Sequence, residues 1–157
     1  MAFKGTDEMG ETFANVSQRT GASGNWDDLM VVQGLGWLLW QADKTAHHVV
    51  PKMPAVDGKT SKDTALLIAH FQRTAVKRKN PEGFVNPAVA AKKSQYTIST
   101  GAGMIIAGLG LKPYDVVDFL SATWRSATWL SATWPALARP LRVSIEREHS
   151  TEREISY

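Results

Sequence analysis

The feature that most constrains the fold of this chain is an apolar run without a polar face. Residues 29–42 read LMVVQGLGWLLWQA, and on a helix their apolar side chains point in nearly every direction. A helix of this kind is stable in water only when other elements cover it. The run therefore predicts a buried central helix, with Trp37 and Trp40 in the core of a mainly α-helical fold.

Local signals indicate how this helix begins and packs. Asp27 or Asp28 is the expected N-cap. Gly34 and Gly36 lie inside the helix, where each costs about 1 kcal/mol relative to alanine. Glycine in such a position usually allows another backbone to approach closely, so we expect a helix–helix contact there.

A second helix is predicted from Lys62 to about Lys79, with Thr60 or Ser61 as its N-cap. Its apolar side contains Leu67, Ile68, Phe71 and Ala75. Its C-terminal end is basic and contains Arg73, Lys77, Arg78 and Lys79. Cations at this end complement the helix dipole, and the turn residues 80–83 are expected to stop the helix.

The rest of the sequence is less regular. A third helix is expected between Ala88 and Ala107, and a fourth over Pro113–Ala122. Ser-Ala-Thr-Trp then occurs three times, and its five-residue spacing fits neither a helix nor a strand. The tryptophans of these repeats are Trp124, Trp129 and Trp134. They are expected to pack over the helices, to form a protein interface or to present a glycan surface. Because indole faces stack on sugars, Trp26 is a further candidate for glycan contact.

Composition excludes several classes of protein. The chain has 157 residues, the length of one domain. It contains no cysteine, and this absence excludes a disulfide scaffold, thiol catalysis and zinc sites with cysteine ligands. Its net charge of +3 is too small to indicate nucleic acid as a partner, although residues 71–112 carry most of the excess positive charge. No secretory signal is recognised in residues 1–20, and the glycine-interrupted run 98–111 is too short to span a membrane. We therefore expect synthesis in the cytoplasm, no membrane span, and delivery to the periplasm, where it occurs, by a non-classical secretion route.

The sequence also lacks the usual signatures of catalysis. No two of its histidines have the i, i+4 spacing of a helical metal pair, and no Gly-x-Ser-x-Gly or paired-acid pattern is present. We therefore expect no catalytic residue, no metal, no cofactor and no enzymatic activity.

One constellation carries more information than the rest. Residues 56–72 read VDGKTSKDTALLIAHFQ. They combine a tight Asp57–Gly58 turn, a capped helix start, Phe71 on the apolar face and Gln72, whose side chain is positioned to hold a loop. This segment resembles the repeat of the peptidoglycan-binding-domain family, Asp-Gly-x-x-Gly-x-x-Thr-x-x-Ala-Val/Ile-x-x-Phe-Gln. The positions that match are Asp57, Gly58, Thr64, Ile68, Phe71 and Gln72.

The resemblance extends over about residues 26–110 and includes departures. Ser61 replaces the third glycine of the motif, and Leu67 replaces the usual alanine. Upstream, residues 31–33 resemble the Leu-Gln element of the preceding helix in that family. Downstream, residues 83–87 resemble a Gly-x-Val-Asp-Pro loop that leads to the last helix in some members.

The resemblance implies a small three-helix bundle that docks on bacterial peptidoglycan and performs no chemistry. The implied organisation is a polar N-terminal lead-in (1–25), a peptidoglycan-binding-like domain (26–111), and a Trp-rich C-terminal extension with a helix, the repeats and a charged tail (112–157). A shallow groove is expected between the loops 43–62 and 80–87. The expected ligand-binding residues are Asp57, Lys59, Ser61, Arg73 and Lys77.

Two other functions remain open at this point. The first is a protein-interaction module, as a component or cargo of a bacterial contractile (type VI-like) secretion system, with Trp124, Trp129 and Trp134 at the interface. The second is a small cell-wall hydrolase. The expected partners are thus an envelope glycan or another protein, and nucleic acid is not expected.

Overall fold

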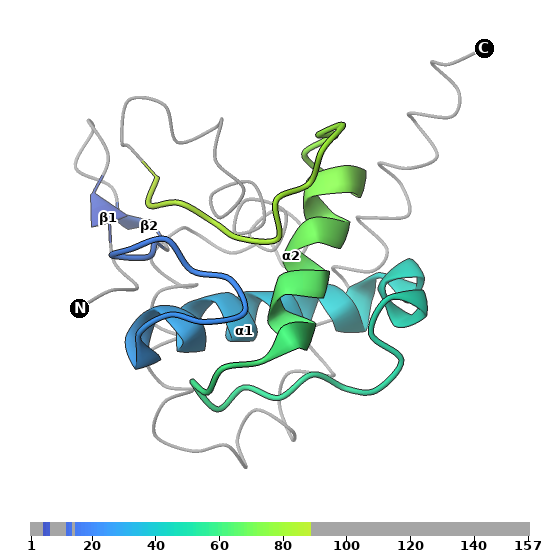
Figure 1. Ribbon diagram of the computed structural model, residues 1–157, viewed down its shortest axis with the longest axis horizontal. Helices are drawn as coiled ribbons and strands as arrows, with labels where there is room; N and C mark the ends of the chain where they lie inside the picture. Colours follow the sequence, from blue (N-terminus) through green and yellow to red (C-terminus); the bar gives the residue numbers. More distant parts are fainter. Residues whose placement is uncertain (1–4, 7–11, 14, 89–157) are drawn as a thin grey trace.

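Two helices dominate the part of the chain that the computed structural model describes, which comprises residues 5–6, 12–13 and 15–88 (Figure 1). Helix α1 covers Trp26–Ala42, the 3₁₀ helix η1 covers Lys44–His48, and helix α2 covers Lys62–Thr74. Two short strands precede them, β1 (Gly5–Thr6) and β2 (Thr12–Phe13), which pair antiparallel. The prediction of a mainly helical protein is confirmed for these residues.

Helix α1 begins earlier than predicted because Asn25 is its N-cap, and the prediction of Asp27 or Asp28 is wrong. The Asn25 side chain accepts a hydrogen bond from the Asp28 N–H at 2.9 Å. Both aspartates lie instead in the first turn of α1, where a negative charge is favourable beside the helix dipole.

The burial of α1 agrees with its apolar sequence. Trp37 and Trp40 both lie in the core, as predicted. Gly36 faces α2, and a Cβ atom added there would lie 3.7 Å from Leu67 Cδ1. The predicted helix–helix contact is therefore present, but at Gly36 it involves a side chain and leaves room for alanine.

Helix α2 lies across α1 and presents its apolar side to it (Figure 1). Leu67, Ile68 and Phe71 are buried, as the periodicity predicts. A cluster of buried side chains joins α1, η1 and α2; it consists of Trp40, Ala46, Val50 and Leu67. Trp40 Nε1 donates to Val50 O at 2.8 Å, so the polar atom of this buried indole is paired.

The C-terminal end of α2 differs from its prediction. The helix ends at Thr74 and not near Lys79. Lys77 adopts a left-handed conformation with a φ of 61°, which turns the chain away from the helix axis. Of the basic side chains expected on the last turns, Arg73 alone lies within α2, and the others follow it in the turn.

The N-terminal strap (residues 15–25) packs on the helices, although its polar sequence predicted a lead-in outside the domain. Val16 and Thr20 are buried. Thr20 exchanges two backbone hydrogen bonds with Val85, at 2.9 and 2.8 Å. Asn15 bonds both the N–H and the C=O of Ala88, at 2.8 and 3.1 Å. The strap therefore ties the segment that follows α2 to the start of α1.

Three predictions concern residues outside the described part of the chain. They are the third helix beyond Ala88, the fourth helix over Pro113–Ala122, and the repeat tryptophans Trp124, Trp129 and Trp134. Within residues 15–88 and the two short strands, no helix combines the length and the apolar character needed to cross a membrane.

Candidate functional site

The Asp57–Gly58 turn before α2 is held by a glutamine of α1. Gln33 is buried, and its Oε1 accepts hydrogen bonds from the N–H groups of Asp57 and Gly58, at 3.1 and 2.9 Å. Its Nε2 donates to Lys59 O at 2.9 Å. Gly58 has a φ of 70°, a conformation that strains any residue with a Cβ atom. One side chain thus fixes three consecutive residues, an arrangement that we call a glutamine clasp.

A second glutamine clasp forms after α2. Gln72 Oε1 accepts from the N–H groups of Glu82 and Gly83, at 2.8 and 3.0 Å, and its Nε2 donates to Phe84 O at 2.8 Å. Gly83 has a φ of 75°. The two clasps share the same order of an acidic residue, a left-handed glycine and a third residue whose C=O accepts. The loop-holding role predicted for Gln72 is confirmed, whereas the matching role of Gln33 was missed. The signal in the sequence is that two acid–glycine pairs occur, Asp57–Gly58 and Glu82–Gly83, and a buried glutamine holds each of them.

The first clasp determines how the predicted ligand residues are presented. Asp57 and Lys59 are exposed on either side of the buried Gly58, and Ser61 is half-buried one step before α2. The Asp57 carboxylate accepts from the Lys59 N–H at 3.0 Å. Ser61 occupies the N-cap position as predicted, but its N–H donates to Ala22 O on the strap at 2.8 Å and its side chain makes no cap bond. These three residues therefore lie together on one turn.

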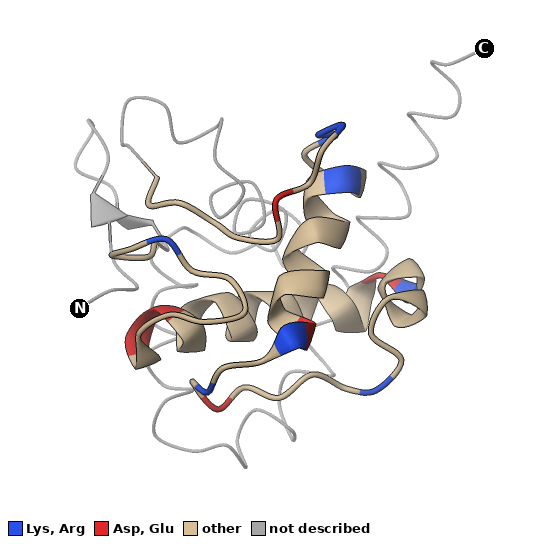
Figure 2. Ribbon diagram, in the orientation of Figure 1, with Lys and Arg blue, Asp and Glu red and all other residues tan. Residues whose placement is uncertain are grey.

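Arg73 and Lys77 are not part of this group. They lie at and beyond the C-terminal end of α2, whereas residues 57–61 precede its N-terminal end (Figure 2). The twelve steps from Lys62 to Thr74 span about 18 Å at 1.5 Å per residue. The five residues therefore form two separate groups and not one binding site.

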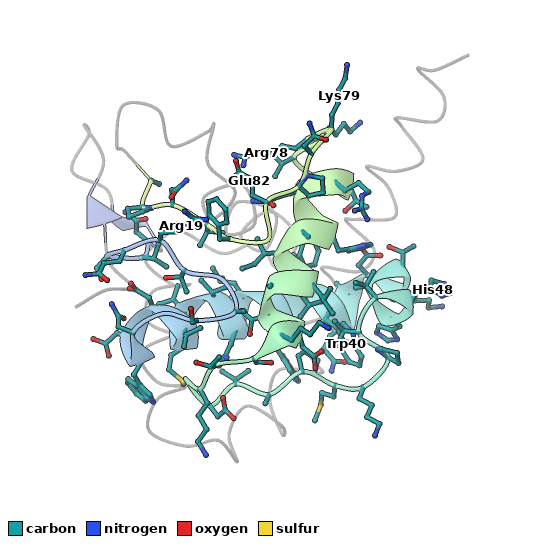
Figure 3. All side chains as sticks on the ribbon, viewed as in Figure 1. Arg19, Trp40, His48, Arg78, Lys79 and Glu82 are labelled. Carbon is teal, nitrogen blue, oxygen red and sulfur yellow. The ribbon has the colours of Figure 1, made fainter. Side chains whose placement is uncertain are left out.

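The basic end of α2 has its own internal contact. Arg78 pairs with Glu82 at 3.1 Å, and both side chains lie partly exposed beside the turn (Figure 3). Lys79 extends away from the protein at the same end. This surface is positively charged, but the ion pair neutralises part of it.

The strap crosses the place where a groove was predicted. Its residue Ala22 bonds the loop before α2, and its residue Thr20 pairs with Val85 of the loop after α2. The Arg19 guanidinium lies 3.5 Å from the centre of the Phe84 ring (Figure 3). The loops 43–62 and 80–87 are therefore bridged by protein and do not border an open channel at these contacts.

Trp26 lies against the first clasp, a relationship that sequence spacing did not indicate. A Cβ atom added to Gly58 would lie 2.4 Å from Trp26 Cδ1 and 2.5 Å from Nε1, so the indole covers this glycine. Trp26 is nevertheless 50% exposed as a residue. The turn face, defined here as Trp26, Asp57, Lys59 and Ser61, thus combines an exposed aromatic ring with polar side chains.

A polar cluster built on the buried pair His70 and Asp43 lies at the other end of α1, with the exposed Thr45 beside it. His70 Nε2 lies 3.1 Å from Asp43 Oδ2 and 3.1 Å from Thr45 Oγ1, and Thr45 Oγ1 donates to Asp43 Oδ1 at 2.6 Å. A hydrolytic triad needs the acid on one imidazole nitrogen and the nucleophile on the other. Here both partners meet the same nitrogen, so the cluster joins η1 to α2 without the geometry of a triad.

The other two described histidines, His47 and His48, lie on η1. His47 stacks on Trp40, with ring centroids 3.9 Å apart, and His48 is exposed on η1 (Figure 3). Among residues 15–88 and the short strands, no three His, Cys, Asp or Glu side chains come together in a group able to hold a metal ion.

Asp43 gives a prediction about acid stability. Burial raises the pKa of its carboxyl, but the hydrogen bonds from His70 and Thr45 lower it more, and the pKa lies below its ordinary value of 3.8. The stability contributed by Asp43 is therefore fully present above about pH 4 and is lost as the pH falls through the lower folded pKa.

The acid limb of the unfolding free energy measures this contribution. Between pH 2 and 5, Asp43→Asn should reduce the slope by up to about 1.4 kcal/mol per pH unit, the value for one proton. Thr45→Val should narrow the pH range of this loss and reduce its total, because it removes a hydrogen bond that lowers the folded Asp43 pKa and so brings that pKa closer to the unfolded value. Identical acid limbs in wild type and Asp43→Asn would contradict the linkage.

Comparison of the chain with protein-family models, curated proteins and solved structures found no match.

Proposed function

We propose that this chain is a non-catalytic module that binds the bacterial cell wall, with the turn face as its contact surface. The proposal starts from the resemblance of residues 56–72 to the peptidoglycan-binding-domain family, and extends to a three-helix bundle completed by residues beyond α2. The observation that carries it is the first glutamine clasp. The buried Gln33 bonds the backbone of the motif turn, so the turn does not need the side chains of Asp57 and Lys59 to anchor it to the core. Both residues are exposed and can contact a ligand.

The chemistry of the turn face suits peptidoglycan. The Lys59 ammonium can donate hydrogen bonds to oxygen atoms of the wall polymer, and the Asp57 carboxylate can accept them from its hydroxyl groups or amines. Because the turn is fixed before binding, little conformational entropy is lost when a ligand docks. Arg73 and Lys77 are left out of this site because α2 separates them from it.

Co-sedimentation with purified peptidoglycan sacculi at low salt tests the proposal. Low salt preserves the attraction between exposed charges, which is screened beyond about 10 Å at 0.1 M. Wild-type protein should pellet with the sacculi, and Lys59→Ala should bind several-fold more weakly. Lys52→Ala is the matched control, since Lys52 is an exposed lysine of the same loop outside the turn face.

Asp57→Asn removes the negative charge but preserves the turn, because an asparagine side chain still accepts a hydrogen bond from the Lys59 N–H. Protein that stays wholly in the supernatant would reject cell-wall binding. Equal losses in Lys59→Ala and Lys52→Ala would place the contact outside the turn face.

A further inference from the structure

The indole of Trp26 is an exposed aromatic surface with a fixed support. Among the described residues with large apolar side chains, Trp26 and Met53 stand out as exposed, at 50% and 60%. Leaving a large apolar surface in water is unfavourable. Trp26 is the first residue of α1, so the helix start fixes the position of its backbone.

The support is the first glutamine clasp. The pyrrole part of the indole covers Gly58, and the space between them excludes even one Cβ atom. Gly58 itself is held by Gln33 through a hydrogen bond of 2.9 Å. One side of the ring therefore rests on a rigid turn while the residue is 50% exposed, which makes the ring a preformed platform.

The surroundings of the ring are polar. The exposed side chains of Asp57 and Lys59 flank Gly58 directly in sequence, so a carboxylate and an ammonium group belong to the same turn that supports the indole. A pyranose ring has a flat C–H face and a rim of hydroxyl groups. An aromatic platform with hydrogen-bond donors and acceptors beside it matches both parts of such a ligand.

We propose that Trp26 stacks on a sugar ring of the glycan strand, with Asp57 and Lys59 bonding its hydroxyl groups. This assigns the glycan, and not the peptide stem, as the ligand of the turn face, and it rests on the proposed cell-wall function. A peptide carboxylate would need Lys59 alone and would leave the indole unused.

The test uses the full chain and two probes, the tetramer of β-1,4-linked N-acetylglucosamine by isothermal titration and purified sacculi by co-sedimentation. Trp26→Ala should bind the tetrasaccharide about tenfold more weakly, and Trp26→Phe, which keeps a flat ring, should retain most of the affinity. Met53→Ala, which removes the other exposed apolar side chain, should bind like wild type. Circular dichroism and the unfolding midpoint verify that Trp26→Ala is folded.

The outcomes separate the inference from the proposed function. Binding of wild type to sacculi but not to the tetrasaccharide, or equal affinities of wild type and Trp26→Ala, overturns the sugar platform and leaves cell-wall binding in place. Tetrasaccharide binding that depends on Trp26, without binding to sacculi, supports the platform and removes the cell-wall assignment. Absence of binding to both probes overturns both.

Discussion

Gln72→Ala is expected to destabilise the protein by about 3 kcal/mol, which corresponds to a fall of about 10 °C in the midpoint of thermal unfolding. Gln72 is fully buried and bonds the N–H of Glu82, the N–H of Gly83 and the C=O of Phe84. Alanine removes all three partners at once, and each backbone group left unpaired costs about 1–3 kcal/mol where water cannot reach it. Urea unfolding at neutral pH measures the change.

Gln18→Ala is the matched control for this prediction. Gln18 is an exposed glutamine of the strap that uses its backbone groups, as donor to Asp28 and acceptor from Thr20. Its replacement should change the unfolding free energy by less than about 0.5 kcal/mol. A loss below about 1 kcal/mol in Gln72→Ala would mean that other contacts hold the loop.

Gln72→Glu makes the test more specific. Glutamate keeps an oxygen that accepts from Glu82 and Gly83, but as a carboxylate it has no N–H for Phe84 O and it brings a charge into a buried site. The Gln72→Glu protein should therefore be no more stable than the Gln72→Ala protein at neutral pH. Recovery of wild-type stability in Gln72→Glu would show that the two accepted bonds alone hold the loop.

The elements that the sequence predicted well are those with local physical causes. Helix α1 is apolar on all sides because it is buried on all sides. Leu67, Ile68 and Phe71 recur at helical spacing because one side of α2 is buried. The tight turn at Gly58 follows from glycine's access to positive φ. Each of these signals is contained in a few neighbouring residues, so no knowledge of the tertiary structure is needed.

The strap could not be predicted in this way, because its burial depends on polar contacts. Residues 15–25 contain few apolar side chains, and a hydropathy pattern assigns such a segment to solvent. What holds it are the bonds of Asn15 to Ala88, of Thr20 to Val85, and of Asp28 to residues 17 and 18. The partners are distant in sequence. Hydrogen bonds between distant segments produce no periodic pattern of apolar residues from which they could be predicted.

The candidate site was predicted in part for a related reason. Asp57, Lys59 and Ser61 lie together on one turn, as expected for residues that are close in the motif. Arg73 and Lys77 were grouped with them although a helix converts a short sequence separation into about 18 Å of distance. The contact between Trp26 and Gly58 was missed because it depends on how the start of α1 meets the turn before α2.

Asp28→Ala is the second change with a large expected effect, about 3 kcal/mol of lost stability together with release of the strap. Asp28 is fully buried at the start of α1, and its carboxylate accepts from the Ser17 N–H and Oγ, the Gln18 N–H and Asn25 Nδ2, at 2.8 to 3.0 Å. None of these donors is charged. The Asp28 carboxylate is therefore stabilised by hydrogen bonds and by the positive end of the helix dipole, and not by an ion pair with these groups. Hydrogen exchange at the Ser17 and Gln18 amides should accelerate in the variant, and urea unfolding should give the free energy.

Asp27→Ala is the closest control that the chain offers, because Asp27 lies in the same first turn and carries the same charge but is only partly buried. If the helix dipole were the main reason for an acid at this position, the two alanine variants would lose similar amounts, about 0.3–1 kcal/mol. Asp28→Asn adds a further distinction, since its amide nitrogen would face a donor in place of one carboxylate oxygen and should leave at least one strap group unpaired. A stable Asp28→Asn with unchanged exchange at Ser17 would show that the strap is held by the Thr20–Val85 pairing and not by the buried carboxylate.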